Sequence, residues 1–116
     1  MARSTNPVSP IGSDAREGAR RRARRSAEYR AEAERLAPFE ALARLIIKHR
    51  LALGLTQQAL AQRMGTSHSA VSRMESGQHP TKPETLRRLA HALELRFVMG
   101  FESGPADRPV RELVEV

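Results

Sequence analysis

A short run of apolar and small residues in the middle of the chain constrains its fold more than any other feature. Between residues 57 and 74, apolar side chains recur at spacings of three and four, which is typical of amphipathic helices. Gly65 can adopt the left-handed conformation that ends a helix, and Ala61 is small enough to let two helices cross closely. The full pattern consists of Gln57, Leu60, Ala61, Met64, Gly65, Val71 and Met74. It predicts two short helices that cross at a fixed angle.

Two hydroxyl residues mark where these helices begin. Thr56 follows Gly54, which ends the preceding helix, and its hydroxyl can cap the helix predicted over residues 57–64. Ser67 has the same place before the second helix. Two short helices joined by a tight turn form a helix-turn-helix motif.

Further helices are predicted on both sides of this motif. One spans residues 39–53 and is closed by Gly54, and another begins at Glu84. Their apolar stripes are formed by Phe39, Leu42, Leu45, Ile46, His49 and Leu53 in the first, and by Leu86, Leu89, Ala90 and Leu93 in the second. Residues 38–94 are therefore expected to form one helical domain around these stripes.

The residues before this domain are predicted to form a disordered arm and a short helix. Residues 1–25 are basic, carry prolines and glycines and have almost nothing apolar to bury, which indicates disorder. Arg20–Arg25 contains five arginines, which fit either a solvated tail or an arm lying along DNA phosphates or in a minor groove. Residues 26–37 predict an extra amphipathic helix that Pro38 interrupts.

The residues after the domain alternate between apolar and other side chains. The alternation over residues 95–101 predicts a strand, with Leu95, Phe97, Met99 and Phe101 on one face. Residues 102–116 contain a glycine and two prolines and are expected to be a flexible tail, although residues 110–116 could become ordered on a partner. With no second strand expected in the chain, the strand is predicted to pair with its copy in a homodimer. The alternative is that it packs on its own helices.

Composition narrows the range of partners. The chain has 116 residues, 20 Lys and Arg against 13 Asp and Glu, and a formal net charge of +7, which favours a polyanionic partner. Three Phe, one Tyr and no Trp are too few for the stacking that single strands and RNA loops require, so double-stranded DNA is favoured.

Without cysteine, and with its histidines in different segments, the chain is expected to hold no metal or other cofactor. No secretory signal or membrane-length apolar run is visible, and a cytoplasmic protein without membrane contact is expected.

The sequence resembles the lambda-repressor/Cro-type (Xre) helix-turn-helix family over about residues 40–94. The resemblance is carried by Leu53–Gln57, Leu60–Ala61, Met64–Ser67 and Ala70–Gly77. It departs only at Thr66, a turn position that is more often apolar in the family. The implied fold class is all-α: a five-helix lambda-repressor-like DNA-binding domain, here with an extra N-terminal helix and a short C-terminal strand.

This resemblance also implies which residues contact DNA. Base readout is expected from the second helix of the motif, at His68, Ser69, Ser72 and Arg73. Phosphate contacts are expected at Gln57, Thr56, Ser67, Thr81 and Lys82, and a structural ion pair between Arg50 and Glu75. The alternatives are that Arg73 is solvated or pairs with a phosphate, and that Ser69 and Ser72 are merely exposed.

Within the family, the extra helix and the C-terminal strand are similar to those of HigA-type antitoxins. That resemblance implies a homodimer that represses its own operon and neutralises a RelE/HigB-like ribonuclease toxin. Two alternatives stay open: a stand-alone repressor without a toxin, and an adaptor that uses the fold to bind proteins. An enzyme is not expected, because His68, Ser69 and Glu75 are spaced along one helix in a way that cannot assemble a nucleophile, base and orienting acid.

Overall fold

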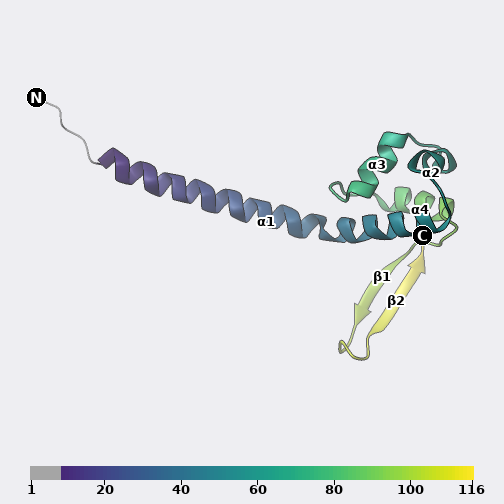
Figure 1. The fold of residues 1–116 in the computed structure, drawn as a ribbon. Helices are drawn as coiled ribbons and strands as arrows, with labels where there is room; N and C mark the ends of the chain where they lie inside the picture. Colours follow the sequence, from purple (N-terminus) through teal and green to yellow (C-terminus); the bar gives the residue numbers. More distant parts are fainter. Residues whose placement is uncertain (1–8) are drawn as a thin grey trace, which may run out of the picture. The chain divides into compact units, whose positions relative to one another are not determined.

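The computed structural model describes residues 9–116, with their side chains from Asp14 onward. The chain divides after Arg35 into two compact units, which are described separately. Four helices and two strands follow one another: α1 (Ser9–Ala52), α2 (Gln57–Met64), α3 (His68–Ser76), α4 (Pro83–Ala92), β1 (Val98–Ser103) and β2 (Val110–Glu115) (Figure 1).

The first unit is helical in its described part. Alanine, arginine and glutamate, all strong helix formers, make up most of residues 14–35, and Glu17 and Arg21 pair one turn apart at 3.7 Å. Residues 9–25 are therefore helical, which corrects the prediction of a disordered arm over residues 1–25. Its first eight residues lie outside the described part. High intrinsic helix propensity outweighs the lack of apolar residues to bury.

Pro38 lies inside α1 and does not end a helix, contrary to the prediction that it interrupts one. A proline within a helix removes one backbone hydrogen bond. Leu36 before it, and Ala43 and Ile46 after it, are buried at 6%, 4% and 6% exposure, so packing on both sides of the proline holds the helix together. The two helices predicted over residues 26–37 and 39–53 are one.

The core of the second unit lies between residues 36–52 of α1 and the three shorter helices, which gather around that segment (Figure 1). Leu60 of α2 and Val71 of α3 are fully buried at its centre. The other members of the core cluster are Ile46, Ala61, Met64, Met74, Leu86, Leu89 and Leu93. The apolar pattern of residues 57–74 thus packs as its spacing predicts.

Each helix in the described part of the chain is followed by a residue in the left-handed conformation, and after α4 this residue is not a glycine. Gly65 has a φ of 70°, and the amide of Thr66 after it donates to the carbonyl of Ala61 at 2.9 Å. Glu94 has a φ of 61° after α4, where the amide of Leu95 donates to the carbonyl of Ala90 at 2.8 Å. Leu95, expected in a strand, therefore belongs to the turn that ends α4.

The C-terminal residues form a β-hairpin, which corrects the predictions of a strand that pairs only with its copy and of a flexible tail. β1 pairs antiparallel with β2 of the same chain, with Met99 opposite Val114 and Phe101 opposite Glu112. Residues 104–109, with one glycine and two prolines, form the connecting loop. The premise that this chain lacks a second strand was wrong, because these turn-forming residues join two strands and do not begin a tail.

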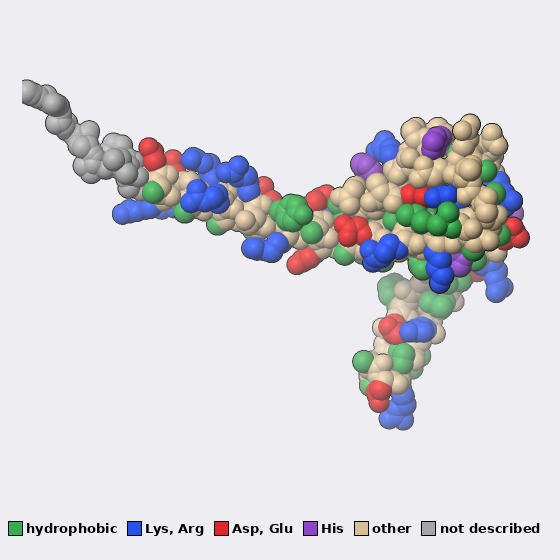
Figure 2. Space-filling model, viewed as in Figure 1, with side chains coloured by type: hydrophobic (Ala, Val, Ile, Leu, Met, Phe, Trp, Pro, Cys, Tyr) green, Lys and Arg blue, Asp and Glu red, His purple; other side chains and the backbone are tan. Residues whose placement is uncertain are grey.

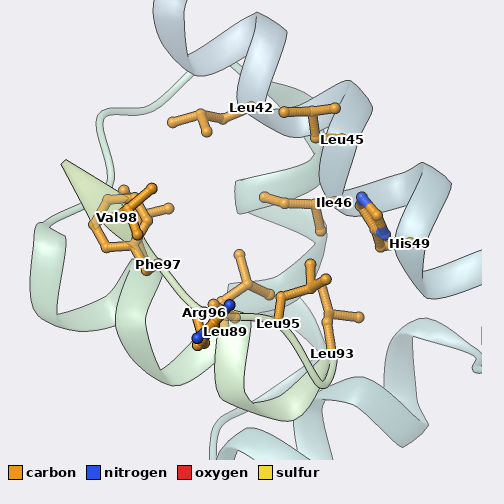
Figure 3. Close-up of a pocket in the computed structure, with 12 residues that line it drawn as sticks. Leu42, Leu45, Ile46, His49, Leu89, Leu93, Leu95, Arg96, Phe97 and Val98 are labelled. Atoms are coloured by element: carbon orange, nitrogen blue, oxygen red, sulfur yellow. The ribbon is translucent and has the colours of Figure 1, made fainter. Parts of the chain in front are cut away.

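The first part of the predicted strand packs on the helices. Phe97 contacts the core cluster and, with Leu95, lines an apolar pocket of about 260 Å³ beside Leu42 and Ile46 of α1 (Figure 3). Only Met99 and Phe101 of the four expected strand residues lie in β1. Over residues 9–116 the fold is therefore mostly helical, with four helices and a small antiparallel sheet, and this part of the chain differs from an all-α fold with five helices.

Candidate nucleic-acid interface

The helix-turn-helix is built from α2 and α3, and both helices are capped by the hydroxyls that the sequence predicts. The Thr56 hydroxyl accepts a hydrogen bond from the Ala59 amide at 3.0 Å, and the Ser67 hydroxyl accepts one from the Ala70 amide at 3.1 Å. Ala61 is buried where the two helices meet. The start of each helix presents a positive dipole end, which is the usual backbone element for holding a phosphate.

A buried ion pair connects α1 with the end of α3. Arg50 donates from Nε to Glu75 Oε2 at 2.7 Å and from Nη2 to Glu75 Oε1 at 3.0 Å, a two-point contact. Its Nη1 also donates to the carbonyl of Leu55 at 2.8 Å. The side chains of Arg50 and Glu75 are only 12% and 4% exposed. The pair fixes the position of α3 against α1 and against the loop before α2.

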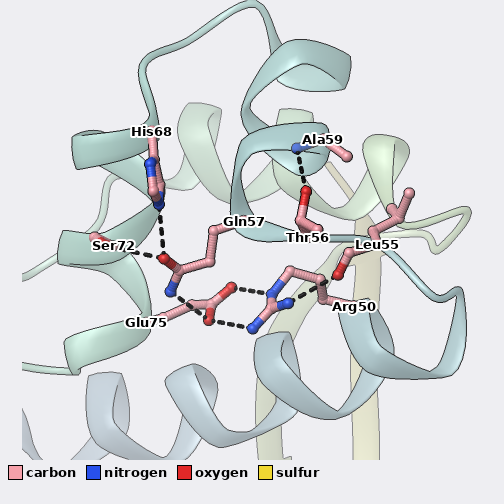
Figure 4. A network of polar contacts seen from close by, with 8 residues as sticks. All are labelled: Arg50, Leu55, Thr56, Gln57, Ala59, His68, Ser72 and Glu75. Carbon is pink, nitrogen blue, oxygen red and sulfur yellow. Dashed lines mark hydrogen bonds and ion pairs between the residues drawn. The ribbon is translucent and has the colours of Figure 1, made fainter.

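Gln57 links this ion pair to the exposed face of α3 (Figure 4). Its Nε2 donates to Glu75 Oε1 at 3.0 Å. Its Oε1 accepts a hydrogen bond from the Ser72 hydroxyl at 3.1 Å and lies 2.9 Å from Nε2 of His68. A continuous polar network thus runs from α1 through a buried carboxylate to two exposed side chains of α3.

The four residues expected to read bases are all exposed on α3. They are His68, Ser69, Ser72 and Arg73. Ser69 lies near the cap, with its hydroxyl 3.2 Å from the hydroxyl of Ser67. Two of the five expected phosphate contacts, Thr81 and Lys82, lie in the loop before α4. The structure therefore places the expected contact residues on α3, at the starts of α2 and α3, and in this loop.

A cationic hollow of about 400 Å³ adjoins α3. Arg73, Thr81 and Lys82 line it, and so do three residues that the sequence analysis missed: His79, Thr85 and Arg88. Hydroxyl and cationic groups around one open hollow suit a phosphate. The clustering of these six residues depends on how the loop returns to α4, which no local sequence pattern reveals.

The two neighbouring arginines of α4 differ in their partners. Arg87 donates to the Glu84 carboxylate at 2.6 Å, and this hydrogen bond lowers the pKa of Glu84 and raises that of Arg87. Arg88 lines the hollow. The charge of Arg87 is therefore compensated on the helix surface, whereas Arg88 adds to the positive charge beside α3.

Comparison with known proteins identifies the family of this domain. The HTH_3 helix-turn-helix family model matches residues 46–98. The restriction-modification controller protein C.AhdI from Aeromonas hydrophila is 30% identical, with a TM-score of 0.50 over 52% of this chain and 87% of that protein. The chain belongs to the HTH_3 family. A second member, an HTH_3 family transcriptional regulator from Vibrio cholerae, is 27% identical, also with a TM-score of 0.50 over 52% of this chain.

This HTH_3 chain spans only 34% of the Vibrio cholerae regulator, and no curated protein matches it. Among the residues that the structure describes, no helix is long and apolar enough to cross a membrane. The same part of the chain contains no group of three His, Asp or Glu side chains that could hold a metal ion.

Proposed function

We propose that this HTH_3 protein is a transcription regulator that binds double-stranded DNA in a sequence-specific manner through α3. The observation that carries the proposal is the exposed polar face of α3, held in place by the Arg50–Glu75–Gln57 network and flanked by the cationic hollow. Proteins with this motif place the second helix in the major groove and position it by contacts to phosphates. The two relatives named above are described as a controller protein and a transcriptional regulator.

The proposed roles divide the contact residues into two classes. His68, Ser69, Ser72 and Arg73 read base edges, and Arg73 carries the donor fork that suits the O6 and N7 acceptors of guanine. The residues that face phosphates are Thr56, Gln57, Ser67, Thr81 and Lys82, together with His79 and Arg88 of the hollow. The first class sets the sequence preference, and the second class sets the salt-dependent affinity.

We expect Arg73→Ala and Lys82→Ala to weaken DNA binding in different ways. Arg73→Ala is expected to weaken binding to the preferred site by about 1–3 kcal/mol and to relax one base position. Lys82→Ala is expected to weaken binding to all sequences alike and to lower the salt slope by about one. The measurement is a titration of the chain's own promoter fragment and of random DNA at several salt concentrations. Equal effects of both changes on both DNAs would contradict this division of roles.

The regulator is proposed to act as a homodimer through the hairpin. The cross-strand register places four apolar side chains on one face together with Ser103 and Glu112. The four are Met99, Phe101, Val110 and Val114, and their exposures in the single chain are 42%, 85%, 57% and 65%. Apolar side chains on the hairpin are visible in the space-filling view (Figure 2). A two-stranded hairpin is marginally stable by itself. A second copy would cover this face, and a dimer would present two α3 helices to the two halves of an operator.

Replacing the aromatic side chain of this face by a charged one is expected to dissociate the dimer. Phe101→Arg would replace the aromatic side chain of this face by a guanidinium opposite Glu112 and so remove its apolar contact with a second copy, whereas Leu113→Arg lies on the opposite face of the hairpin and serves as the matched control. Sedimentation velocity should show a dimer for the unmodified chain and for Leu113→Arg, and a monomer for Phe101→Arg. A monomeric unmodified chain, or a Phe101→Arg dimer, would contradict the proposed interface.

A second candidate function is that of an antitoxin, which would bind a RelE/HigB-like toxin in addition to DNA. The observation that favours it is the amount of exposed structure outside the matched domain, namely the helix over residues 14–35 and the hairpin. A stand-alone repressor is the alternative. Adding the product of an adjacent small reading frame to the promoter titration separates them. A co-purifying neighbour that changes promoter affinity supports the antitoxin, and no effect of the neighbour supports the stand-alone repressor.

A further inference from the structure

The direction of the hydrogen bonds through Gln57 determines what α3 presents to a ligand. The starting point is Glu75, whose ionised carboxylate can only accept hydrogen bonds. It accepts two from Arg50 and one from Nε2 of Gln57, and its side chain is 4% exposed. Because a carboxylate paired with Arg50 has no hydrogen to donate, the Gln57 amide must turn its NH₂ group toward Glu75.

The carbonyl oxygen of Gln57 therefore faces α3 and requires donors. Ser72 donates its hydroxyl hydrogen to Gln57 Oε1 at 3.1 Å. Nε2 of His68 lies 2.9 Å from the same oxygen (Figure 4). Since Oε1 is an acceptor, the hydrogen of this contact belongs to Nε2 of His68.

This polarity fixes the remaining hydrogen-bonding capacity of both exposed side chains. A neutral imidazole carries one N–H, so a hydrogen on Nε2 of His68 leaves Nδ1 as an acceptor. Ser72 has one hydroxyl hydrogen, and its donation to Gln57 leaves only the lone pairs of Oγ. Both side chains thus present acceptors to the solvent.

We propose that Glu75, acting through Gln57, sets His68 and Ser72 as hydrogen-bond acceptors and thereby selects bases that carry an amino group. In the major groove, such donors are N6 of adenine and N4 of cytosine. Arg73 on the same face has only donors and is suited to guanine. The inference rests on the proposed function, because it specifies which base edges the α3 face selects. Gln57 is here a positioning residue, in addition to any contact that it makes with a phosphate.

The tautomer of His68 tests the first half of the proposal without DNA. Long-range ¹H–¹⁵N NMR spectra of the whole chain at about pH 8, where imidazole side chains are generally neutral, should show Nε2 protonated and Nδ1 bare. His49, His79 and His91 provide references in the same sample. In Gln57→Leu the His68 signals should move toward a mixture of tautomers, whereas Gln58→Leu should leave them unchanged. Protonation of Nδ1 in the unmodified chain would overturn the proposal.

Selection from a random double-stranded DNA library tests the second half. The unmodified chain and Gln58→Leu should prefer adenine or cytosine by at least about fivefold at the positions facing His68 and Ser72. Gln57→Leu should lose this preference and keep the position read by Arg73. Guanine or thymine at those positions would overturn the base selection while leaving the proposed function intact. If the chain showed no preference for any sequence, both the base selection and the proposed sequence-specific function would be overturned. This would hold even if the NMR spectra showed His68 protonated at Nε2.

Discussion

Replacing Arg50 by methionine is expected to lower the free energy of unfolding by about 3–5 kcal/mol. The substitution keeps most of the aliphatic volume and removes the guanidinium that makes two hydrogen bonds to Glu75. The carboxylate of Glu75, which is 4% exposed, would then keep only the Gln57 amide as a partner. A buried charge without its counter-charge is strongly destabilising, because water can no longer solvate it.

The matched control is the double variant Arg50→Met/Glu75→Leu, which removes both charges. It is expected to recover most of the lost stability, since an apolar pair of similar volume replaces a buried ion pair at little net cost. Urea denaturation followed by far-ultraviolet circular dichroism is the suitable measurement, because the chain has no tryptophan. A single variant as stable as the unmodified chain would show that the ion pair does not hold α3 in place.

Replacing Gly77 by alanine is expected to lower the free energy of unfolding of the second unit, residues 36–116, by about 3 kcal/mol. Gly77 has a φ of 69°, and a side chain in this left-handed conformation costs about 1–2 kcal/mol. The added Cβ would also lie 2.8 Å from the Cα of Glu40, a backbone atom of α1 that cannot rotate away. Overpacking of this kind adds about 1–3 kcal/mol.

Gly54→Ala separates these two contributions. Gly54 has the same φ of 69°, but a Cβ at this position would meet nothing within 4 Å. Its replacement is therefore expected to cost about 1 kcal/mol, from the backbone conformation alone. Equal losses for the two variants in urea denaturation would mean that the close approach of α3 to α1 at Gly77 is not rigid.

Local rules account for the helix-turn-helix. Ala61 and Gly65 are recognisable because a close helix crossing and a left-handed turn each admit few residue types. Thr56 and Ser67 are recognisable because a hydroxyl before a helix satisfies amides within three residues of it. Such interactions join residues one or two helical turns apart, so a short stretch of sequence is enough to predict them.

The errors occur where local signals conflict with packing or propensity. The stop signal of Pro38 is overridden because Leu36 and Ile46 are buried on either side of it. The disorder expected from a basic composition is overridden over residues 9–25 by helix propensity. Glycine and proline, which are found in residues 104–109, are as typical of a flexible tail as of a hairpin loop. Only the pairing of β1 with β2 shows that these residues form a hairpin loop.

The sequence by itself determined the two motif helices, their caps, the apolar pattern that packs them and the candidate contact residues on α3, because each depends on residues a few positions apart. Only the tertiary structure decided that β1 pairs with β2, that Arg88 and His79 join Lys82 around one hollow, and that Gln57 bridges Glu75 to His68. Those contacts join residues distant in the chain. Their geometry follows from how the helices pack around the core, and no local pattern encodes it.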